Sequence, residues 1–304
     1  MSSLSKNAVQ ELINRASTLM EALPYIRQFY GKVFVIKYGG HAMVDEELKE
    51  SFAKDIIMMR LVGMVPIVVH GGGPQIGQVM ERMGLESKFH EGIRITDQET
   101  MDVVEMVLVG KVGKAIVSLI NQHGGKAIGL SGKDGKLLEA TKVSPGTIKN
   151  AEGINELIDL GRVGEITCVH TQVLELLEKD QFIPVIAPVG VSESGEALNI
   201  NADLVASALA GALKAEKLIL LTDVEGVKNK QGELLSQLKP KQALKLIEDQ
   251  TISGGMIPKV KCCLQALKEG VRSAHIIDGR LKHAVLLETL TDKGVGTVFF
   301  GEKA

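Results

Sequence analysis

The sequence predicts an α/β fold, specifically a three-layer α/β/α sandwich with a mainly parallel central sheet. Two observations support this prediction. Apolar strand-like runs alternate with helix-like segments along most of the 304 residues, and each strand-like run ends in a turn that contains glycine. Strands that alternate with helices are joined by right-handed crossovers, which place helices on both faces of a parallel sheet. No linker rich in Pro or Ser divides the chain, so we expect one continuous sheet.

The first predicted element is an amphipathic helix over residues 4–23, where apolar residues recur at helical spacing. This helix could pack on its own domain. A helix that precedes the compact fold can equally offer its apolar face to another subunit, and we favour that interpretation. We therefore divide the chain into an oligomerising helix (1–23) and a main domain (24–304), which has an N-terminal lobe over about 24–190 and a C-terminal lobe over about 191–304.

Six strand-like runs follow this helix. With their glycine turns they are VFVIKYGG (33–40), PIVVHGGG (66–73), KAIGLSGKDG (126–135), PVIAPVG (184–190), KLILLTDVEG (217–226) and AHIIDG (274–279). The longer helices are expected over 45–63, 74–84, 97–122, 201–214 and 240–270, and short polar hairpins near 88–95, 136–142, 191–199 and 225–235. Ligands of such sheets bind beyond the carboxyl ends of the strands, where the glycine turns lie.

Composition excludes several classes of protein. The formal net charge of -2 and the absence of tryptophan argue against nucleic acid as a partner. No segment approaches the roughly 20 apolar residues of a membrane span, and the N-terminus lacks the apolar run of a secretory signal. The three cysteines form no CxxC pair, so we expect a cytoplasmic protein. His41, His70 and His170 lack ligand-like spacing, so no protein-bound metal is expected.

The glycine triplet in VVHGGGPQIG (68–77) is not part of a P-loop. Gly72 and Gly77 have the spacing of that motif, but Gln78 stands where it requires lysine. An NAD-dependent oxidoreductase is the alternative from a different class. Its GxGxxG fingerprint is also missing, because Ile76 occupies the position of the third glycine. We expect His70 to support this turn rather than to take part in catalysis.

A lysine and two glycines at the end of the first predicted strand indicate an anionic ligand. Lys37 precedes Gly39 and Gly40, and the glycine triplet repeats the arrangement on the second strand. Exposed backbone amides and a helix N-terminus bind phosphate or carboxylate oxygen atoms. The alternatives are a solvated lysine and glycines that only supply positive φ angles.

The segments KYGG, HGGG, GIRIT, NINAD, LLTDVEG and GGMIPKV follow one another in the order found in the amino acid kinase family. The chain resembles that family from about residue 24 to 300, and most resembles the members that use ATP to phosphorylate the side-chain carboxylate of N-acetyl-L-glutamate in arginine biosynthesis. The resemblance implies a phosphate-binding system without a P-loop, Mg²⁺ carried by the nucleotide, an N-terminal lobe for the acyl amino acid and a C-terminal lobe for the nucleotide.

The resemblance also implies a role for individual residues. Lys37 and Lys259 stabilise the transferring phosphoryl group, and Asp203 orients both lysines. The substrate-binding residues are Gly72, Gly73, Arg94 and Asn199, and those on the nucleotide side are Gly39, Gly40, Asp223 and Lys259. Each residue has a plainer interpretation, for example Arg94 in an ordinary hairpin or Lys259 as a surface charge. For Asn201 we prefer a helix N-cap.

The chemistry of this reaction is consistent with those residue types. A carboxylate nucleophile with a pKa of about 4.3 is already ionised at neutral pH, so no general base is needed. The difficulty is repulsion between the carboxylate and the γ-phosphoryl group. Cations and amides that stabilise charge on the transferring group address that difficulty.

The C-terminal segment 278–297, DGRLKHAVLLETLTDKGVGT, together with the N-terminal helix, resembles the arginine-inhibited, hexameric members of the family. That resemblance implies a homo-hexamer, a trimer of dimers, and an inhibitory L-arginine site lined by Tyr25, His283, Glu288, Gly294 and Gly296. A helix capped by a glycine turn explains the segment equally well. A related kinase that acts on N-acetylaminoadipate remains an alternative, because its one additional methylene changes selectivity by only about 1–3 kcal/mol. Sister kinases that act on carbamate or on other amino acids share parts of the same glycine pattern. A non-catalytic arginine sensor is disfavoured, because Lys37 and Lys259 are both present.

Overall fold

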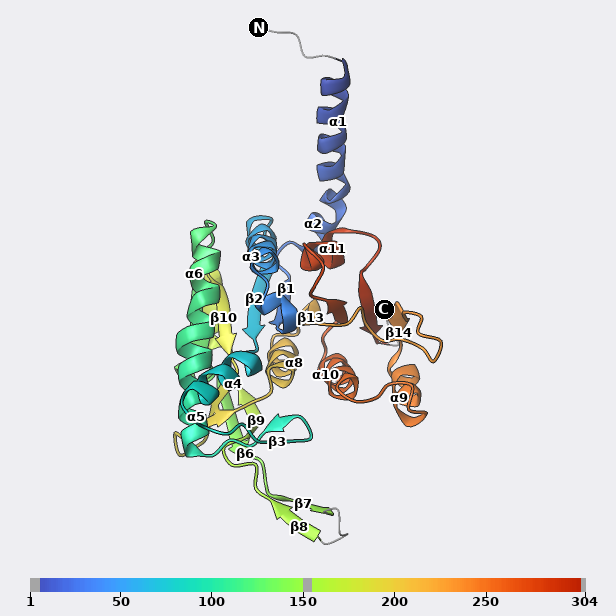
Figure 1. Ribbon diagram of the computed structural model, residues 1–304. Helices are drawn as coiled ribbons and strands as arrows, with labels where there is room; N and C mark the ends of the chain where they lie inside the picture. The colour runs from blue at the N-terminus through green and yellow to red at the C-terminus, as the bar shows by residue number, and fades with distance from the viewer. Residues whose placement is uncertain (1–5, 150–154, 302–304) are drawn as a thin grey trace.

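The computed structural model of the protein describes residues 6–149 and 155–301. Its core is an eight-stranded sheet (Figure 1), in which β15 and β16 are antiparallel and all other neighbours are parallel. The strand order is β14 (Gln237–Leu238), β16 (Gly296–Phe300), β15 (Ser273–Asp278), β13 (Lys217–Thr222), β1 (Val33–Tyr38), β2 (Val65–His70), β10 (Ile183–Ala187) and β5 (Ala127–Ser131). The predicted α/β/α sandwich and its six glycine-terminated strands are confirmed.

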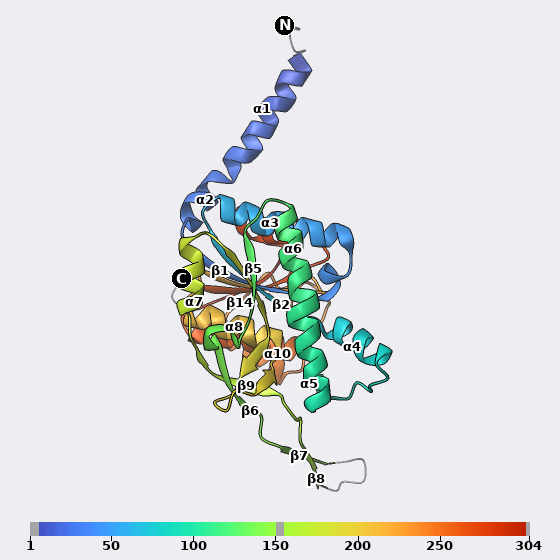
Figure 2. The same cartoon turned by 90° about the vertical axis from the view of Figure 1, so that its left-hand side faces the viewer.

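Helices cover both faces of this sheet (Figure 2). One face carries α2 (Leu23–Phe29), α3 (Glu46–Leu61), α6 (Lys114–Gln122) and α11 (Ala284–Leu290). The other carries α7 (Gln172–Lys179), α8 (Ala202–Ala212), α9 (Pro240–Glu248) and α10 (Met256–Lys268). Strand alternation divides the core between them: Phe34 and Ile36 of β1 pack on the α3 side, and Val35 packs on the α8 side. All three side chains are fully buried.

The expectation of one continuous sheet holds for the six predicted strands, which all belong to the eight-stranded sheet, but the described residues also form a second sheet that was not predicted. A second sheet of four strands has the order β12 (Ala197–Asn199), β11 (Val189–Val191), β6 (Leu138–Lys142) and β9 (Gly164–Val169). Two separate hairpins are formed by β3 (Phe89–His90) with β4 (Ile93–Arg94) and by β7 (Gly146–Lys149) with β8 (Asn155–Ile158). The sequence did not predict the β7–β8 hairpin, because its apolar residues do not show a clear strand period.

The four predicted hairpins have different outcomes. Those near 88–95 and 191–199 are confirmed as β3–β4 and β11–β12. The segment near 225–235 forms a single antiparallel bridge between Lys228 and Leu234. The hairpin near 136–142 is wrong, because β6 pairs with the distant strand β9 instead of folding back on itself.

Two of the predicted long helices are interrupted. The stretch 97–122 consists of α5 (Gln98–Glu105), a π-helical segment (Met106–Gly113) and α6. Residues 240–270 form the two helices α9 and α10 instead of one. The break coincides with Gly254, which adopts a φ of 54°, and Gly255, which precedes α10. Glycine accepts such positive angles without a steric penalty.

The predicted N-terminal helix is α1 (Lys6–Glu21), which extends away from the body of the molecule (Figures 1 and 2). Its apolar side chains are largely exposed, including Val9, Leu12, Ile13 and Leu19. In the described part of the chain, no helix is long and apolar enough to cross a membrane.

The topology of the sheet determines where a ligand can bind. Strand β1 continues into α3 on one face, whereas its neighbour β13 leads through β14 to α9 and α10 on the other face. The connections that leave two adjacent parallel strands therefore diverge at their carboxyl ends. Open α/β sheets bind ligands in the crevice that such a divergence creates.

Candidate active site

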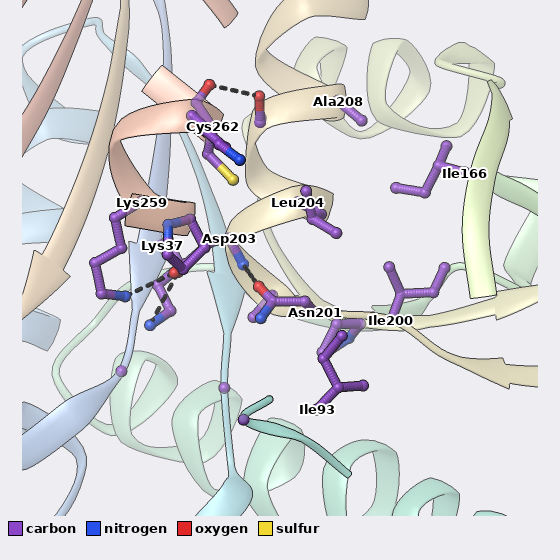
Figure 3. Close-up of a pocket in the computed structure, with 18 of the residues that line it drawn as sticks. Lys37, Ile93, Ile166, Ile200, Asn201, Asp203, Leu204, Ala208, Lys259 and Cys262 are labelled. Atoms are coloured by element: carbon purple, nitrogen blue, oxygen red, sulfur yellow. Dashed lines mark hydrogen bonds and ion pairs between the residues drawn. The ribbon is translucent and has the colours of Figure 1, made fainter. Parts of the chain in front are cut away.

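A large cavity of about 1340 Å³ opens at the carboxyl edge of the sheet. Its wall is built from the end of β1, the glycine triplet after β2, and the N-terminal turns of α8 and α10. The turn between β3 and β4 and part of β9 complete it. Figure 3 shows polar groups on one side of the cavity and the apolar side chains of Ile93, Ile166, Ile200 and Leu204 on the other.

Asp203 holds two lysines that are far apart in the sequence. Its Oδ1 lies 3.2 Å from Lys37 Nζ, and its Oδ2 lies 2.6 Å from Lys259 Nζ. Lys37 comes from β1, Asp203 from the first turn of α8, and Lys259 from the first turn of α10 (Figure 3). The side chain of Asp203 is only 8% exposed, whereas those of Lys37 and Lys259 are 12% and 22% exposed. Both ammonium groups are therefore held at the cavity wall and remain within reach of a ligand.

The charge state of Asp203 follows from this arrangement. Burial raises the pKa of its carboxyl group, but the positive charges of Lys37 and Lys259 outweigh burial and leave the pKa below its ordinary value. Asp203 is thus an anion at neutral pH. Asn201 fixes the position of its backbone, because the Asn201 Oδ1 accepts a hydrogen bond of 2.8 Å from the Asp203 N–H. The predicted N-cap role of Asn201 is confirmed.

The glycines after β1 permit a close approach of two charged groups. A side chain at Gly39 would lie 2.5 Å from Lys37 Nζ. A side chain at Gly40, which has a φ of 70°, would overlap the carboxylate of Asp223. Both glycines line the cavity. Any larger residue would therefore displace Lys37 or Asp223 from the place where the two strands diverge.

The glycine triplet after β2 forms the opposite part of the wall. Gly72 is the N-cap of α4 (Gly73–Arg82), so the N-terminus of this helix is directed at the cavity. A Cβ atom at Gly72 would lie 2.5 Å from Leu108 in the π-helical segment. The extra residue of a π-helical turn places that segment against the triplet, and such turns often occur at functional sites.

His70 precedes the triplet and is fully buried. Burial lowers the pKa of its imidazole to about 4, so the ring is neutral at physiological pH. Its Nδ1 lies 2.9 Å from the carbonyl oxygen of Gly71, to which it donates. This contact confirms the predicted supporting role of His70.

Arg94 presents a guanidinium group to the cavity from β4. Its Nη1 donates to Ser87 Oγ at 2.6 Å, its Nη2 donates to the Gly73 carbonyl oxygen at 3.1 Å, and the group stacks 4.6 Å from the centre of the Phe89 ring. Burial lowers the pKa of Arg94, yet an arginine remains a cation in proteins. Among the described residues no carboxylate forms an ion pair with Arg94, so its charge is available to an anionic ligand.

Asn199 is connected to Arg94 by a short chain of hydrogen bonds. The Asn199 Nδ2 donates to Thr96 Oγ1 at 3.1 Å, and Thr96 Oγ1 donates to the Arg94 carbonyl oxygen at 2.8 Å. Thr96 was not singled out from the sequence, although it lies in the GIRIT segment beside Arg94. The structure therefore brings nine of the predicted catalytic, substrate and nucleotide residues to one cavity: Lys37, Gly39, Gly40, Gly72, Gly73, Arg94, Asn199, Asp203 and Lys259.

Known proteins resemble this chain over most of its length. The model of the amino acid kinase family matches residues 32–278. The chain belongs to the amino acid kinase family. Acetylglutamate kinase of Syntrophus aciditrophicus is 59% identical to it over 291 residues, which are 96% of this chain and 98% of that enzyme. Acetylglutamate kinase of Geobacter sulfurreducens is 59% identical over 289 residues, or 95% of this chain and 99% of that enzyme.

Solved structures share the fold of this amino acid kinase. The N-acetylglutamate synthase of Neisseria gonorrhoeae, complexed with coenzyme A and N-acetyl-glutamate, superposes with a TM-score of 0.81 at 23% identity. The match covers 95% of this chain and 64% of the synthase, so the chain spans less than two thirds of that protein. Carbamate kinase of Giardia lamblia bound to AMP-PNP superposes with a TM-score of 0.61 at 16% identity. At these identities the likeness concerns the fold alone.

Asp223, the remaining residue predicted on the nucleotide side of this kinase, lies in a neighbouring cavity of about 410 Å³. Arg280 also lines that cavity and is bound in two places by Asp278, at 2.9 Å from Nε to Oδ1 and 2.7 Å from Nη2 to Oδ2. Neither Asp278 nor Arg280 was predicted from the sequence as a site residue. The sequence could have indicated them, because Asp278 ends a predicted strand, β15, at the same edge of the sheet as Lys37 and Asp223.

The five residues predicted to bind arginine are only partly brought together. Glu288 is buried, and a side chain at Gly294 would lie 2.9 Å from its carboxylate. Gly296 lies in β16, too close to the Ile276 carbonyl oxygen for any side chain. Tyr25 is half-buried in α2.

His283 is engaged elsewhere. Its Nδ1 lies 2.6 Å from Asp55 Oδ1, and its backbone N–H donates to Ser51 Oγ at 2.7 Å. Glu288 is instead contacted by His275, at 2.7 Å between Nδ1 and Oε1, and by the backbone N–H of Val295 at 3.0 Å. Burial raises the pKa of Glu288, but the contact with His275, the bond from the Val295 N–H and the charge of Lys217 together outweigh it and leave the pKa below its ordinary value.

Proposed function

We propose that this chain transfers the γ-phosphoryl group of ATP to the side-chain carboxylate of N-acetyl-L-glutamate, a reaction of arginine biosynthesis that takes place in the cytoplasm. The observation that carries the proposal is the pair of lysines, Lys37 and Lys259, which Asp203 holds at 3.2 Å and 2.6 Å in one cavity. The near full-length similarity to acetylglutamate kinases supports the same substrate.

The proposed reaction requires stabilisation of charge rather than proton transfer. The acceptor carboxylate is already ionised at neutral pH, so it attacks phosphorus directly. The bond from the bridging oxygen to the γ-phosphorus breaks as the bond from the carboxylate oxygen forms, and ADP leaves with the electron pair. In this proposal Lys37 and Lys259 stabilise charge on the transferring group and the leaving oxygen, and the amides of Gly72 and Gly73 bind the same group.

The substrate is proposed to lie between the glycine triplet and the β3–β4 turn. Arg94 binds its α-carboxylate, since a planar guanidinium forms two parallel hydrogen bonds with a carboxylate. Asn199 lines the same cavity and contributes a polar group close to Arg94. The apolar side chains of Ile93 and Ile166 offer a surface for the acetyl group and the methylene groups.

The nucleotide is proposed to enter beside the glycines that follow β1. Gly39 and Gly40 leave their amides open to phosphate oxygens, and Asp223 with the smaller cavity lies next to them. Mg²⁺ is proposed to arrive on the nucleotide phosphates, where it neutralises charge. Asp203 is unsuited to be its ligand, because both of its oxygens already contact lysines.

The proposal is tested by supplying MgATP with N-acetylglutamate, N-acetylaminoadipate, glutamate, aspartate or carbamate in parallel. Hydroxylamine traps an acyl phosphate as a hydroxamate, and ADP release measures turnover. We expect the highest kcat/KM with N-acetylglutamate and a hydroxamate product. A higher kcat/KM with N-acetylaminoadipate would assign the chain to the related kinase, and turnover without hydroxamate would refute a carboxylate acceptor.

A matched pair of variants connects this activity with the cavity. Lys37→Met should lower kcat about 10²- to 10³-fold, as the loss of one preorganised charge-stabilising donor does. Lys54→Met removes an exposed lysine of α3 and should leave kcat unchanged. Thermal unfolding of both variants confirms that they are folded. Equal activity of the two variants would contradict the role proposed for Lys37.

We also propose that L-arginine inhibits the enzyme and that the chain assembles into a hexamer through α1. The supporting observations are the exposed apolar side chains of α1 and the buried carboxylate of Glu288 next to Gly294. Removal of residues 1–21 should dissociate the hexamer and weaken arginine inhibition while preserving kcat without arginine. Light scattering and inhibition curves measure both effects. An unchanged hexamer with unchanged inhibition would refute this proposal.

A further inference from the structure

Three side chains of different chemistry share one face of the β6–β9 strand pair, outside the cavity described above. Cys168 and His170 are two residues apart at the end of β9, so the strand period places both on the same face. Glu139 of β6 is paired with Cys168 across the two strands. The backbone N–H of His170 donates to the Leu137 carbonyl oxygen at 3.0 Å, which extends the pairing beyond β9 and fixes the position of the histidine.

The donor atoms of these residues converge. One carboxylate oxygen of Glu139, Cys168 Sγ and one ring nitrogen of His170 all lie within 4.8 Å of one another. The Oε2 atom of Glu139 is 3.3 Å from the His170 Nε2. Metal–ligand distances of about 2.0–2.3 Å place the donors of a tetrahedral zinc site roughly 3.3–3.8 Å apart. The carboxylate and imidazole already have that separation, and Cys168 Sγ lies within 4.8 Å of both.

The ligand atoms of His170 and Glu139 are available to a metal ion. His170 Nε2 is shielded from solvent and has no hydrogen bond of good geometry in the described part of the chain; the atom it faces is Glu139 Oε2, itself a proposed ligand. Lys136 interacts with Glu139 through the other oxygen, Oε1, at 3.7 Å, so Oε2 remains free to face the cluster. Cys168 is exposed, which leaves one side of the cluster open to water. A three-ligand zinc site with water in the fourth position has this form.

We propose that Glu139, Cys168 and His170 form a binding site for one Zn²⁺ ion. Thiolate, imidazole and carboxylate together favour a borderline metal such as zinc over magnesium or calcium. Binding requires Cys168 to lose its proton, so each ion bound releases a proton and the affinity increases with pH. No metal site was predicted from the sequence, because that expectation was based on the spacing of the histidines alone. The third ligand is 29 residues away from the nearest of the other two and joins them through strand pairing.

The ion would connect two strands that are imperfectly paired. The register of β6 and β9 shifts between Glu139 and Ala140, directly at the proposed ligand. Farther along the same strand, Gly164 and Ile166 line the large cavity. Zinc therefore holds β9 against β6 at the end opposite to these cavity residues and stabilises the folded chain.

The first test uses the reactivity of the cysteines in the full-length protein. Cys262 and Cys263 are buried, so iodoacetamide should alkylate Cys168 selectively in the folded chain. After chelator treatment and in the absence of nucleotide, added Zn²⁺ should slow this alkylation in proportion to the fraction of chains occupied. His170→Asn should reduce the protection, whereas His123→Asn, at the exposed C-terminal cap of α6, should preserve it. Alkylation at a rate independent of Zn²⁺ would overturn the proposal.

The second test replaces zinc by Co²⁺, which reports its ligands by absorption. One Co²⁺ per chain should give a thiolate-to-metal charge-transfer band and the intense visible bands of tetrahedral cobalt. Cys168→Ser should abolish the charge-transfer band. Glu139→Gln should weaken the affinity for Co²⁺ about 10- to 100-fold or more, because the loss of even an outer-shell partner has an effect of that size. A spectrum of octahedral cobalt, or one identical in wild type and Cys168→Ser, would show that the cluster is a coincidence of surface side chains.

Discussion

Replacement of Asp203 by asparagine tests the charge arrangement most directly. The change preserves the shape of the side chain and removes the charge that holds Lys37 at 3.2 Å and Lys259 at 2.6 Å. At an effective dielectric constant of 20, these distances correspond to attractions of roughly 5 and 6 kcal/mol. Recovered hydration of the buried carboxylate offsets much of that loss. Breaking a buried ion pair costs about 3–5 kcal/mol, and the partial exposure of both lysines places the cost at the lower end.

The catalytic effect of Asp203→Asn should exceed its effect on binding. The lysines lose the group that positions them, so we expect kcat to fall about 10²- to 10³-fold, with a smaller change in the KM for ATP. The hydroxamate assay measures kcat, and denaturant unfolding measures the free energy of unfolding. Asp180→Asn, an exposed carboxylate at the end of α7, is the matched control and should resemble wild type.

The pH dependence of stability gives a second readout for the same variant. The pKa of Asp203 is lowered in the folded state, so its stabilising contribution is complete above the ordinary value of about 3.9 and is lost as the pH falls below it. The difference in unfolding free energy between wild type and Asp203→Asn should therefore shrink in acid. A variant with wild-type kcat, or a difference that is constant down to the acid limit, would refute the reasoning.

Three further predictions follow from individual contacts. Arg94→Lys should raise the KM for N-acetylglutamate about 10- to 100-fold, since a charged hydrogen bond contributes about 1.5–3 kcal/mol, while the KM for ATP stays constant; steady-state kinetics measures both. Gly72→Ala should lower the free energy of unfolding by about 1–3 kcal/mol, because the new Cβ would lie 2.5 Å from Leu108. Gly73→Ala is the control for stability, since a Cβ there would have no neighbouring atom within 4 Å. Burial raises the pKa of Asp55 to about 6, so the folded state binds this proton more tightly than the unfolded state. As the pH rises from about 4 to about 6, the unfolding free energy of wild type should therefore decrease by up to about 3 kcal/mol. Asp55→Asn should lack that decrease in denaturant unfolding.

The fold class was predictable because the sequence repeats one local pattern. A buried strand such as β2 is apolar up to its last residue, His70, and the glycines after it mark its end regardless of the rest of the chain. The same local logic located Lys37 and the glycine turns at the ligand edge of the sheet. Lys259, Arg94 and Asp203 needed more than local pattern. Their functional roles were inferred from resemblance, since each has an ordinary structural interpretation in its own segment.

Local sequence pattern predicted neither the interruption of a long helix nor the pairing of strands that are far apart in the chain. The π-helical segment at 106–113 lies against Gly72 through Leu108, and helical periodicity alone does not reveal it. The strand β6 was expected to form a hairpin, yet its partner is β9, which lies more than 20 residues farther along the chain. The choice of a distant partner depends on which apolar faces the completed core must cover.

The amino-acid sequence by itself determined the alternating strands and helices, the edge at which their glycine turns meet, and the types of charged residue available there. These properties depend on side-chain period and backbone freedom, which act over a few residues. Only the tertiary structure decided that Lys37 and Lys259, 222 positions apart in the sequence, share the carboxylate of Asp203. It likewise brought Glu139 to Cys168 and His170. Such meetings depend on how helices and strands pack against each other, and packing is a property of the whole chain.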